Sequence, residues 1–362
     1  MGVLKGACIF GQSGGPTSVI NASACGVFQQ ALKEDCITKV YGAAHGIKGV
    51  LNEQLYDIGQ EDPKELELLK TAASWAMGSV RYKLKDAEVD EADYKRMLEV
   101  FKKYDVRYFF YNGGNDSMDT CNKISKYMLR HGYECRVMGI PKTIDNDLAA
   151  TDHCPGYGSA AKYIATTCME IYRDAKVYDT GSITVLEIMG RNAGWLAAAS
   201  ALATYKGTGP DLVYLPEVPF DLDAFIEDVA RIYEKNGDVL VAVSEGIRDK
   251  DGKFISAYFS DLSKSTDAFG HARMGGLAAS LAEFANAKIG AKVRGIEFSL
   301  IQRCAAHLAS ETDIEEAYMA GKVALDAAVE GATDKMVAFE RAPGSPYRCL
   351  TKLVDLSDVA NL

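Results

Sequence analysis

The sequence has no long apolar run, no excess of positive charge and no cysteine spacing typical of a metal site or of a disulfide framework. No apolar stretch is long enough to cross a bilayer, and the amino end enters a predicted strand without a basic-then-apolar leader. The net charge of −10 disfavours nucleic acid and anionic membrane surfaces as partners. The nine cysteines lie scattered in apolar segments, which indicates a reducing compartment, and we expect a cytoplasmic protein.

Two familiar phosphate-binding patterns are missing from the first glycine-rich turn, residues 11–18. The turn has neither the P-loop spacing nor the dinucleotide spacing G-x-G-x-x-G, which disfavours a dinucleotide oxidoreductase. What the chain does show is an alternation of short apolar runs and helical periods. This alternation predicts an α/β fold with a parallel, doubly wound sheet, and 362 residues suit two domains.

The predicted elements divide into two similar halves. In the first half we predict strands at 7–10, 39–41, 106–111 and 135–140, and helices at 19–33, 63–76 and 118–131. In the second half we predict strands at 183–188, 212–215 and 239–243, an extended run at 292–301, and helices at 158–173, from about 193, at 220–235 and at 313–330.

The stretch 139–148 is the centre of the functional argument. Lys142, Thr143, Asp145 and Asp147 follow a predicted buried strand within six positions. In a turn at the carboxyl end of a parallel strand, these side chains would point into the crevice where α/β proteins bind ligands. Two carboxylates, a cation and a hydroxyl suit phosphate, a metal ion and a proton to be removed. The alternative is a turn rich in aspartate and asparagine with solvated charges.

Two glycine-rich turns each lead into a helix. The first contains Gly14 and Gly15, and the second spans 112–117 with Asp116 and Ser117. Backbone N–H groups at such a helix start can bind phosphate, and two turns of this type facing one crevice are less expected by chance than one. The alternative for the first is a tight turn that needs positive φ.

Charged residues recur just after predicted strands in the second half. Arg191, Glu245 and Arg303 share this position, where an α/β domain would present ligand contacts. The alternative for each is a surface charge or an ion pair. Arg81 has the same two interpretations, a surface charge or a group over the crevice.

On these motifs the chain resembles a phosphofructokinase. The resemblance rests on motifs in the family's order over nearly the whole chain: Gly14-Gly15 with Asn21, residues 113–117, residues 141–147, Met189-Gly190-Arg191, Ser244-Glu245 and Gln302-Arg303. It implies two similar three-layer α/β domains with mostly parallel sheets and an active site in the cleft between them. The expected donor domain is 1–156 plus 303–344, and the expected sugar-phosphate domain is 157–302 plus 345–362.

The resemblance also implies roles for the central stretch. Asp145 matches the general base that takes the proton from the sugar 1-hydroxyl, and Thr143 matches a residue that touches the transferred phosphoryl group. Asp147 would help to hold Mg²⁺, with Asn115 and Asp116 as further metal candidates, because a hard cation prefers oxygen ligands. Asn115 stands where many members have an aspartate.

For the sugar phosphate, the implied residues come mainly from the second half. Arg191 would bridge the sugar and the transferred phosphoryl group, and Arg294 would reach the sugar phosphate of a neighbouring subunit. This implies a homodimer or homotetramer. The substrate-binding residues implied are Thr143, Asp145, Met189, Gly190, Arg191, Glu245, Arg294 and Arg303. Ser182 stands where an arginine often reaches across the subunit interface, and a neighbouring Lys or Arg is the expected substitute.

Two positions favour pyrophosphate over ATP as the phosphoryl donor. Members that use ATP have glycine where this chain has Asp116 and Lys142. A carboxylate at Asp116 would occupy the room of the nucleotide α-phosphate, and Lys142 would pair with a phosphate oxygen. The expected donor-binding residues are Gly14, Gly15, Arg81, Gly114, Asp116, Ser117 and Lys142.

The expected activity is therefore the reversible transfer of a phosphoryl group from pyrophosphate to fructose 6-phosphate, in glycolysis or gluconeogenesis. An ATP-dependent kinase of the same fold and a non-catalytic sugar-phosphate sensor are the alternatives. Where ATP-using members carry two arginines for a nucleotide effector, this chain has Cys25 and Gln29. We therefore expect no nucleotide or phosphoenolpyruvate regulation through that helix.

Overall fold

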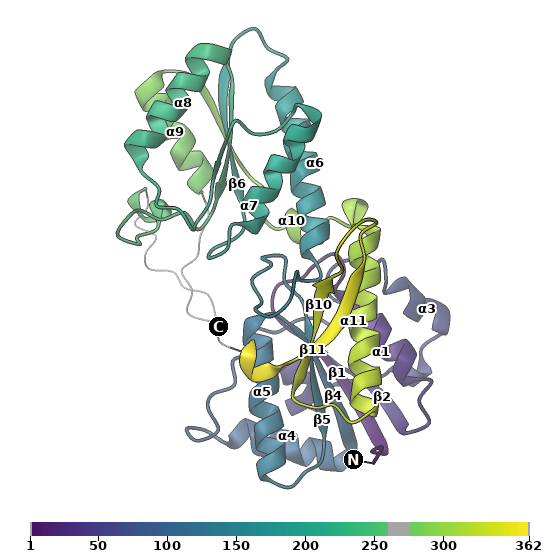
Figure 1. The fold of residues 1–362 in the computed structure, drawn as a ribbon. Helices are drawn as coiled ribbons and strands as arrows, with labels where there is room; N and C mark the ends of the chain where they lie inside the picture. Colours follow the sequence, from purple (N-terminus) through teal and green to yellow (C-terminus); the bar gives the residue numbers. More distant parts are fainter. Residues whose placement is uncertain (1, 260–275, 361–362) are drawn as a thin grey trace. The chain divides into compact units, whose positions relative to one another are not determined.

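The computed structural model of the protein describes residues 2–259 and 276–360 (Figure 1). The chain divides into two compact units, 1–159 with 309–362 and 160–308. Each unit contains a mostly parallel sheet with helices, so the predicted α/β fold class is confirmed. In the described residues, no helix combines the length and the apolar character that a membrane span requires.

The first unit is built on a seven-stranded sheet in the order β11-β10-β5-β4-β1-β2-β3. The strands β1, β2, β4, β5 and β10 are parallel, whereas the edge strands β3 and β11 are antiparallel to their neighbours. Their bounds are Gly6–Gln12 (β1), Ile37–Ala43 (β2), Leu55–Asp57 (β3), Val106–Gly113 (β4), Arg136–Pro141 (β5), Lys335–Arg341 (β10) and Cys349–Asp355 (β11).

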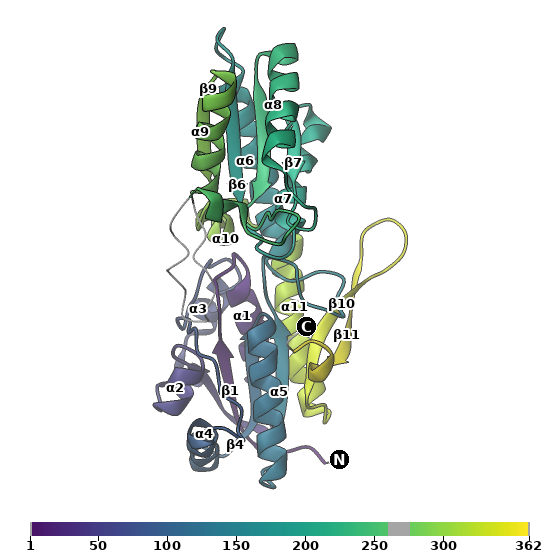
Figure 2. The ribbon, with the colours of Figure 1, turned by 90° about the vertical axis from the view of Figure 1, so that its left-hand side faces the viewer.

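Helices cover both faces of this sheet (Figures 1 and 2). Alternate residues of β4 point to opposite faces: Phe109 packs with α4 and α5, and Phe110 packs with α1 and α11. The result is a three-layer unit with apolar side chains on both sides of the central strands. The helices are α1 (Ile20–Ala31), α2 (Ile47–Leu51), α3 (Pro63–Leu68), α4 (Ala92–Lys103), α5 (Asn115–Arg130) and α11 (Glu311–Val329).

The second unit has a four-stranded parallel sheet in the order β7-β8-β6-β9. Residues of α8 and α9 pack on one face of it, and α6 and α7 lie on the other side in both views (Figures 1 and 2). The bounds are α6 (Tyr157–Ala175), β6 (Ser182–Ile188), α7 (Trp195–Ala199), β7 (Leu212–Tyr214), α8 (Leu222–Asn236), β8 (Val239–Ser244), α9 (Leu277–Ile289), β9 (Lys292–Glu297) and α10 (Ile301–Cys304).

The helix predicted over 63–76 is too long, because α3 ends at Leu68. Side-chain hydrogen bonds from Asn21 on α1 hold the next residues in a loop: its amide donates to the Ala72 carbonyl at 2.9 Å and its Oδ1 accepts from Ala76 N at 3.0 Å. Ser74 has a φ of 71° and its N–H donates to the Thr17 carbonyl. Contacts with a distant segment therefore end this helix early.

The extended run predicted over 292–301 is also too long. The strand β9 ends at Glu297, and Arg303 lies in the short helix α10 rather than directly after a strand. A turn therefore separates Arg303 from the end of β9, and the residue lies in a helix. Arg191 and Glu245, by contrast, lie in turns that follow their strands directly.

The carboxyl-terminal segment lies in the first unit, whereas residues 345–362 were expected in the sugar-phosphate domain. The reason is backbone pairing: β11 is hydrogen-bonded to β10 over its whole length, from Lys335 opposite Asp355 to Arg341 opposite Cys349. Leu356 then packs into the core on the α5 side of the same sheet.

Candidate functional site

The turn after β1 is held in place by the segment that follows α3. Gly14 has a φ of 85°, a conformation that favours glycine, and its N–H donates to the Val80 carbonyl at 3.2 Å. Ser79 Oγ donates in turn to the Gly14 carbonyl at 2.6 Å. The exposed Arg81 comes directly after Val80, so the chain places it beside this turn. Gly14 and Gly15 thus lie in a fixed loop at the carboxyl end of β1.

Lys142 reaches this loop from the end of β5. The residue is only 5% exposed, and its backbone N–H donates to the Gly113 carbonyl at 3.0 Å. The ammonium group lies 3.1 Å from the point that a Cβ of Gly14 would occupy, and 5.6 Å from the centre of the Trp75 ring. A buried cation is therefore positioned against the glycine loop, where it can attract an anion.

The second glycine-rich turn forms the amino end of α5. Gly114 is the N-cap residue, Asn115 and Asp116 belong to the first turn of the helix, and Ser117 is buried. A Cβ at Gly113 would lie 2.0 Å from Ser117 Oγ, so only glycine fits there. The Asp116 side chain is exposed at the positive end of the helix dipole, the place that a phosphate would otherwise favour.

Residues 143–147 form a turn that is closed by side chains. The Thr143 hydroxyl accepts from Asp145 N at 3.1 Å, and Asn146, with a φ of 56°, accepts from Cys154 N at 2.8 Å. The Asp147 side chain keeps contact with solvent, yet the protein atoms around it raise the pKa of its carboxyl. Lys142 and the Thr143 hydroxyl lower the pKa of the same carboxyl and so oppose this rise. The Asp147 carboxylate and the Lys142 cation are thus close enough to influence one another.

All predicted residues of the first unit therefore lie in or next to loops at the carboxyl ends of β1, β4 and β5, which are neighbours in the sheet. They are Gly14, Gly15, Arg81, Gly114, Asn115, Asp116, Ser117, Lys142, Thr143, Asp145 and Asp147.

In the second unit, the turns after β6 and β8 are interlocked. Ser244 Oγ donates to the carbonyl of Gly190, which has a φ of 129°. Glu245 N donates to the Ile188 carbonyl at 2.8 Å, and Met189 N donates to Gln302 Oε1 of α10 at 3.2 Å. A Cβ at Gly246 would lie 2.0 Å from the Arg191 carbonyl oxygen, which shows how closely the two turns approach.

This interlocking brings three predicted side chains together. Burial raises the pKa of the Glu245 carboxyl, and the neighbouring Arg191 and Arg303 guanidinium groups act against that rise. Arg191, Glu245 and Arg303 thus form one group of charges at the carboxyl end of the sheet, with Met189 and Gly190 beside them. A carboxylate near two guanidinium groups can accept from hydroxyls while the cations bind phosphate.

Arg294 is not part of this group. It lies within β9 opposite Thr184, four residues before the end of β6, and it is paired with Asp174 at 2.8 Å. Its side chain is 49% exposed. Lys292, on the same strand, lies opposite Ser182. The structure therefore separates Arg294 from the other predicted sugar contacts of the second unit, and Lys292 lies two residues before it on the same strand.

Four residues near these loops were not predicted as site residues. Trp75 lies over Lys142, Asn146 closes the turn after Thr143, and Gln302 holds Met189. Asp313 accepts from Gly156 N, Ser159 N and Ser159 Oγ at the start of α6. Of these four residues, only Gln302 could have been found from the sequence, because it belongs to the motif Gln302-Arg303. The other three contact residues that are distant in sequence or that have no characteristic spacing.

Comparison with known proteins identifies the family. The family model described as Phosphofructokinase matches residues 8–296. Proteins named pyrophosphate–fructose 6-phosphate 1-phosphotransferase are 45% identical, from Halomonas elongata over 356 residues (97% of this chain, 84% of the relative) and from Methylococcus capsulatus over 357 residues (98% and 84%). A crystal structure of pyrophosphate-dependent phosphofructokinase from Marinobacter aquaeolei is 40% identical, with a TM-score of 0.87 over 99% of this chain and 84% of that chain. The chain belongs to the phosphofructokinase family.

Proposed function

We propose that the chain transfers a phosphoryl group from pyrophosphate to O1 of fructose 6-phosphate, giving fructose 1,6-bisphosphate and phosphate. The observation that carries this proposal is the buried Lys142 ammonium group against the glycine loop at Gly14. The names of the relatives from Halomonas elongata and Methylococcus capsulatus support the same donor and acceptor. The first unit would bind the donor, and the second would bind the sugar phosphate.

The donor preference follows from charge at two positions. Lys142 would pair with an oxygen of a bare diphosphate beside the backbone N–H groups of the glycine loop. Asp116 places a carboxylate in the first turn of α5, where the N–H groups would otherwise favour a further phosphate. A nucleotide would bring its α-phosphate toward that carboxylate and would be repelled, whereas pyrophosphate has no such group.

The chemistry needs one proton transfer and the stabilisation of negative charge. Asp145 would take the proton from the sugar 1-hydroxyl, whose oxygen then forms the new P–O bond while the bridging P–O bond of pyrophosphate breaks. Thr143 and Arg191 would contact the transferred group. Because the bonds broken and formed are close in energy, we expect the reaction to be reversible.

The side chains offered by this site fit Mg²⁺. Asp147, Asp116 and Asn115 present only oxygen donors, from the ends of the neighbouring strands β4 and β5. When bound, Mg²⁺ would neutralise charge on the phosphate oxygens. Asn115 contributes a carbonyl oxygen without charge, so the two aspartates would supply the negative charge of the site.

The acceptor site would be formed by Arg191, Glu245 and Arg303, with Glu245 accepting from sugar hydroxyls and Arg303 binding the 6-phosphate. Arg294 would contact the sugar phosphate of a neighbouring subunit in a homodimer or homotetramer, since it lies away from the group in its own unit. Lys292 would replace the arginine missing at Ser182, because the two residues are partners across β6 and β9.

The test supplies pyrophosphate and ATP separately, each with Mg²⁺ and fructose 6-phosphate, and measures fructose 1,6-bisphosphate. We expect turnover with pyrophosphate, its reversal when phosphate and the bisphosphate are supplied, and little turnover with ATP. The variant Asp145→Asn is the inactive control. Strong turnover with ATP and none with pyrophosphate would refute the donor assignment.

Two further arms separate the alternatives. Tight binding of fructose 6-phosphate without turnover by either donor would identify a sensor. A parallel assay with sedoheptulose 7-phosphate tests whether a longer ketose phosphate is also an acceptor.

The variant Asp116→Gly with Lys142→Gly should lose its preference for pyrophosphate over ATP. An unchanged preference would show that these two positions do not set the choice of donor.

A further inference from the structure

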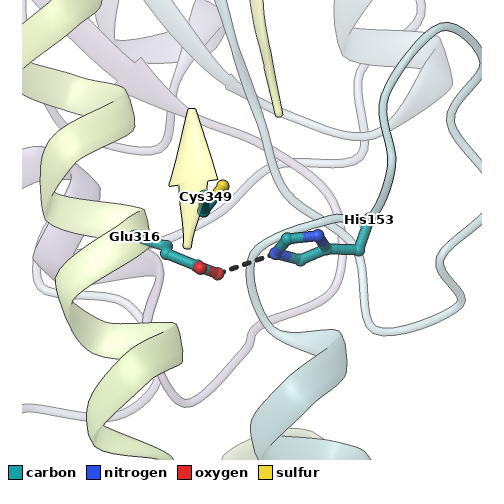
Figure 3. Close-up of side chains that lie close together, drawn as sticks. All are labelled: His153, Glu316 and Cys349. Carbon is teal, nitrogen blue, oxygen red and sulfur yellow. Dashed lines mark hydrogen bonds and ion pairs between the residues drawn. The ribbon is translucent and has the colours of Figure 1, made fainter. Parts of the chain in front are cut away.

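A cluster of three potential metal ligands lies in the first unit, apart from the proposed reaction groups. His153 comes from the loop before α6, Glu316 from α11 and Cys349 from the start of β11 (Figure 3). Each offers one donor atom, a nitrogen, an oxygen and a sulfur, and these atoms lie within 4.8 Å of one another. Segments far apart in sequence thus converge on one point, since 163 residues separate His153 from Glu316.

The His153 ring is held in one orientation. Its Nδ1 lies 3.0 Å from Asp152 Oδ1, its Nε2 lies 2.7 Å from Glu316 Oε2, and the ring packs against Phe339 with 5.0 Å between centres. A carboxylate on the outer ring nitrogen, with the other nitrogen directed inward, is the usual arrangement of a metal-binding histidine.

The other two ligands are also constrained. Glu316 is buried, and its second oxygen accepts from the Tyr347 hydroxyl at 2.6 Å. Burial, together with the Glu316 carboxylate, raises the pKa of the Cys349 thiol to about 12. Burial disfavours the charged form of His153, but Glu316 and Asp152 outweigh that effect and raise its pKa. Each nitrogen of the His153 ring lies at hydrogen-bond distance from a carboxylate oxygen, so the ring is fixed from both sides.

We propose that His153, Glu316 and Cys349 bind Zn²⁺, with the fourth tetrahedral position open to water. A mixed set of nitrogen, oxygen and sulfur donors suits this ion, whereas Mg²⁺ favours oxygen alone. The exchange balances: one Zn²⁺ enters, and the thiol proton of Cys349 and the proton between His153 Nε2 and Glu316 leave to solvent. The proposal is independent of the reaction assigned above.

The bound ion would fix the loop that follows the proposed catalytic turn. Within that loop, Thr151 Oγ1 accepts from Phe339 N, Asp152 N donates to the Phe339 carbonyl, and Cys154 N donates to Asn146. Zn²⁺ would add a tie from His153 to α11 and β11. We therefore expect the ion to raise the thermal stability of the first unit.

The experiment uses the full chain, stripped of metal by a chelator and kept in excess Mg²⁺ to occupy oxygen-ligand sites. Zn²⁺ is titrated against a chromophoric chelator, and Co²⁺ is added in a parallel sample as a spectroscopic probe. We expect one Zn²⁺ per chain and a Co²⁺ charge-transfer band from a thiolate ligand. Cys349→Ser and His153→Asn should each weaken Zn²⁺ binding about tenfold or more, and Cys349→Ser should remove the band.

Cys36→Ser is the matched control, because Cys36 is a partly exposed cysteine of the same unit outside the cluster. It should bind Zn²⁺ like the wild type. Circular dichroism checks that each variant is folded, and Cys349→Ala replaces His153→Asn if the latter does not fold. A wild-type protein without a thiolate band, or unchanged Zn²⁺ affinity in the Cys349 variants, would show that the cluster is only a hydrogen-bonded ion pair.

Discussion

At the scale of single residues, the environment of Lys142 bears on the donor preference that we propose. Its ammonium group is buried between a glycine loop and an aromatic ring, and the loop can approach it because Gly14 has no Cβ. Burying a cation is costly unless an anion compensates it. The Asp147 carboxylate lies close enough to Lys142 to offset part of this cost, and in the proposed function a bound phosphate would add to that compensation.

This argument predicts the effect of Lys142→Met, which keeps most of the volume and removes the charge. We expect kcat/KM for pyrophosphate to fall about tenfold or more, or roughly 1.4 kcal/mol, mainly through a higher KM. Steady-state kinetics with pyrophosphate as the varied substrate provide the measurement. Lys126→Met, an exposed lysine on α5, should behave like the wild type. An unchanged KM in Lys142→Met would mean that the ammonium group does not contact the donor.

Glu187 gives a second prediction at this scale. It is buried on β6, its carboxylate accepts from Ala278 N at the start of α9, and burial raises its pKa to about 7 from a usual value of 4.5. Glu297 and Glu245 add to the rise. Because the folded state holds the proton more tightly than the unfolded state, stability should fall as pH rises from about 4.5 to 7, by about 3 kcal/mol.

The measurement is urea unfolding at pH 5 and pH 8. Glu187→Gln should lose most of this fall in the free energy of unfolding, since it has no proton to release. Glu283→Gln, which changes an exposed glutamate on α9, should keep the wild-type pH dependence. The same fall in Glu187→Gln as in the wild type would assign the effect to another group.

At the scale of elements, the contact between α1 and α11 depends on two glycines. A Cβ at Gly26 would lie 2.1 Å from the Tyr318 carbonyl oxygen, and one at Gly321 would lie 2.0 Å from the Ser23 carbonyl oxygen. Glycine inside a helix costs up to about 1 kcal/mol relative to alanine. Here the absence of a Cβ atom at both glycines allows the two helix backbones to approach closely.

Gly321→Ala should therefore destabilise the protein although alanine is the better helix former. We expect the free energy of unfolding to fall by about 1–3 kcal/mol, because the added methyl group must push α11 away from α1. Denaturant unfolding provides the measurement. Lys322→Ala, at the next and exposed position, is the control and should change stability little. A stabilised Gly321→Ala protein would contradict the close contact.

The same pair of helices bears on the expected absence of nucleotide regulation. Cys25 is fully buried with its Sγ directed at the Leu66 carbonyl, and Gln29 is hydrogen-bonded to Glu67 and to the Tyr318 hydroxyl. These positions contact α3 and α11 and present no cation. We still predict that ADP leaves the affinity for fructose 6-phosphate unchanged, and a several-fold shift in the saturation curve would contradict this.

The elements also show what could be predicted from the sequence. Local patterns correctly placed the strands 7–10, 106–111 and 239–243 and the helix after the first glycine-rich turn, because apolar period and turn residues are local signals. The helix after the second turn was predicted from 118 but begins at Asn115, inside the predicted turn. They failed where distant segments decide. Asn21 holds residues 72–76 in a loop, and β11 joins the first sheet by pairing with β10. No local spacing indicates either partner.

At the scale of the whole molecule, the chain carries two α/β units, each with charged groups at the carboxyl ends of its strands. The first carries Asp145 and Lys142, and the second carries Arg191, Glu245 and Arg303. Arg294 lies elsewhere on the second unit and is half exposed. If Arg294 contacts the sugar phosphate of a neighbouring subunit, each complete site needs residues from two chains.

This requirement can be tested by mixing two variants, Asp145→Asn and Arg294→Ala. Each alone should have low activity, because every site in its homo-oligomer contains the altered residue. In a dimer with one chain of each kind, one site receives both changes and the other receives Asp145 and Arg294 intact. Co-refolded equal mixtures should therefore regain about a quarter of the wild-type activity, the statistical share of intact sites in randomly assorted symmetric dimers. If Arg294 acts in its own subunit, no intact site forms, and the mixture will show only the average of its two parents.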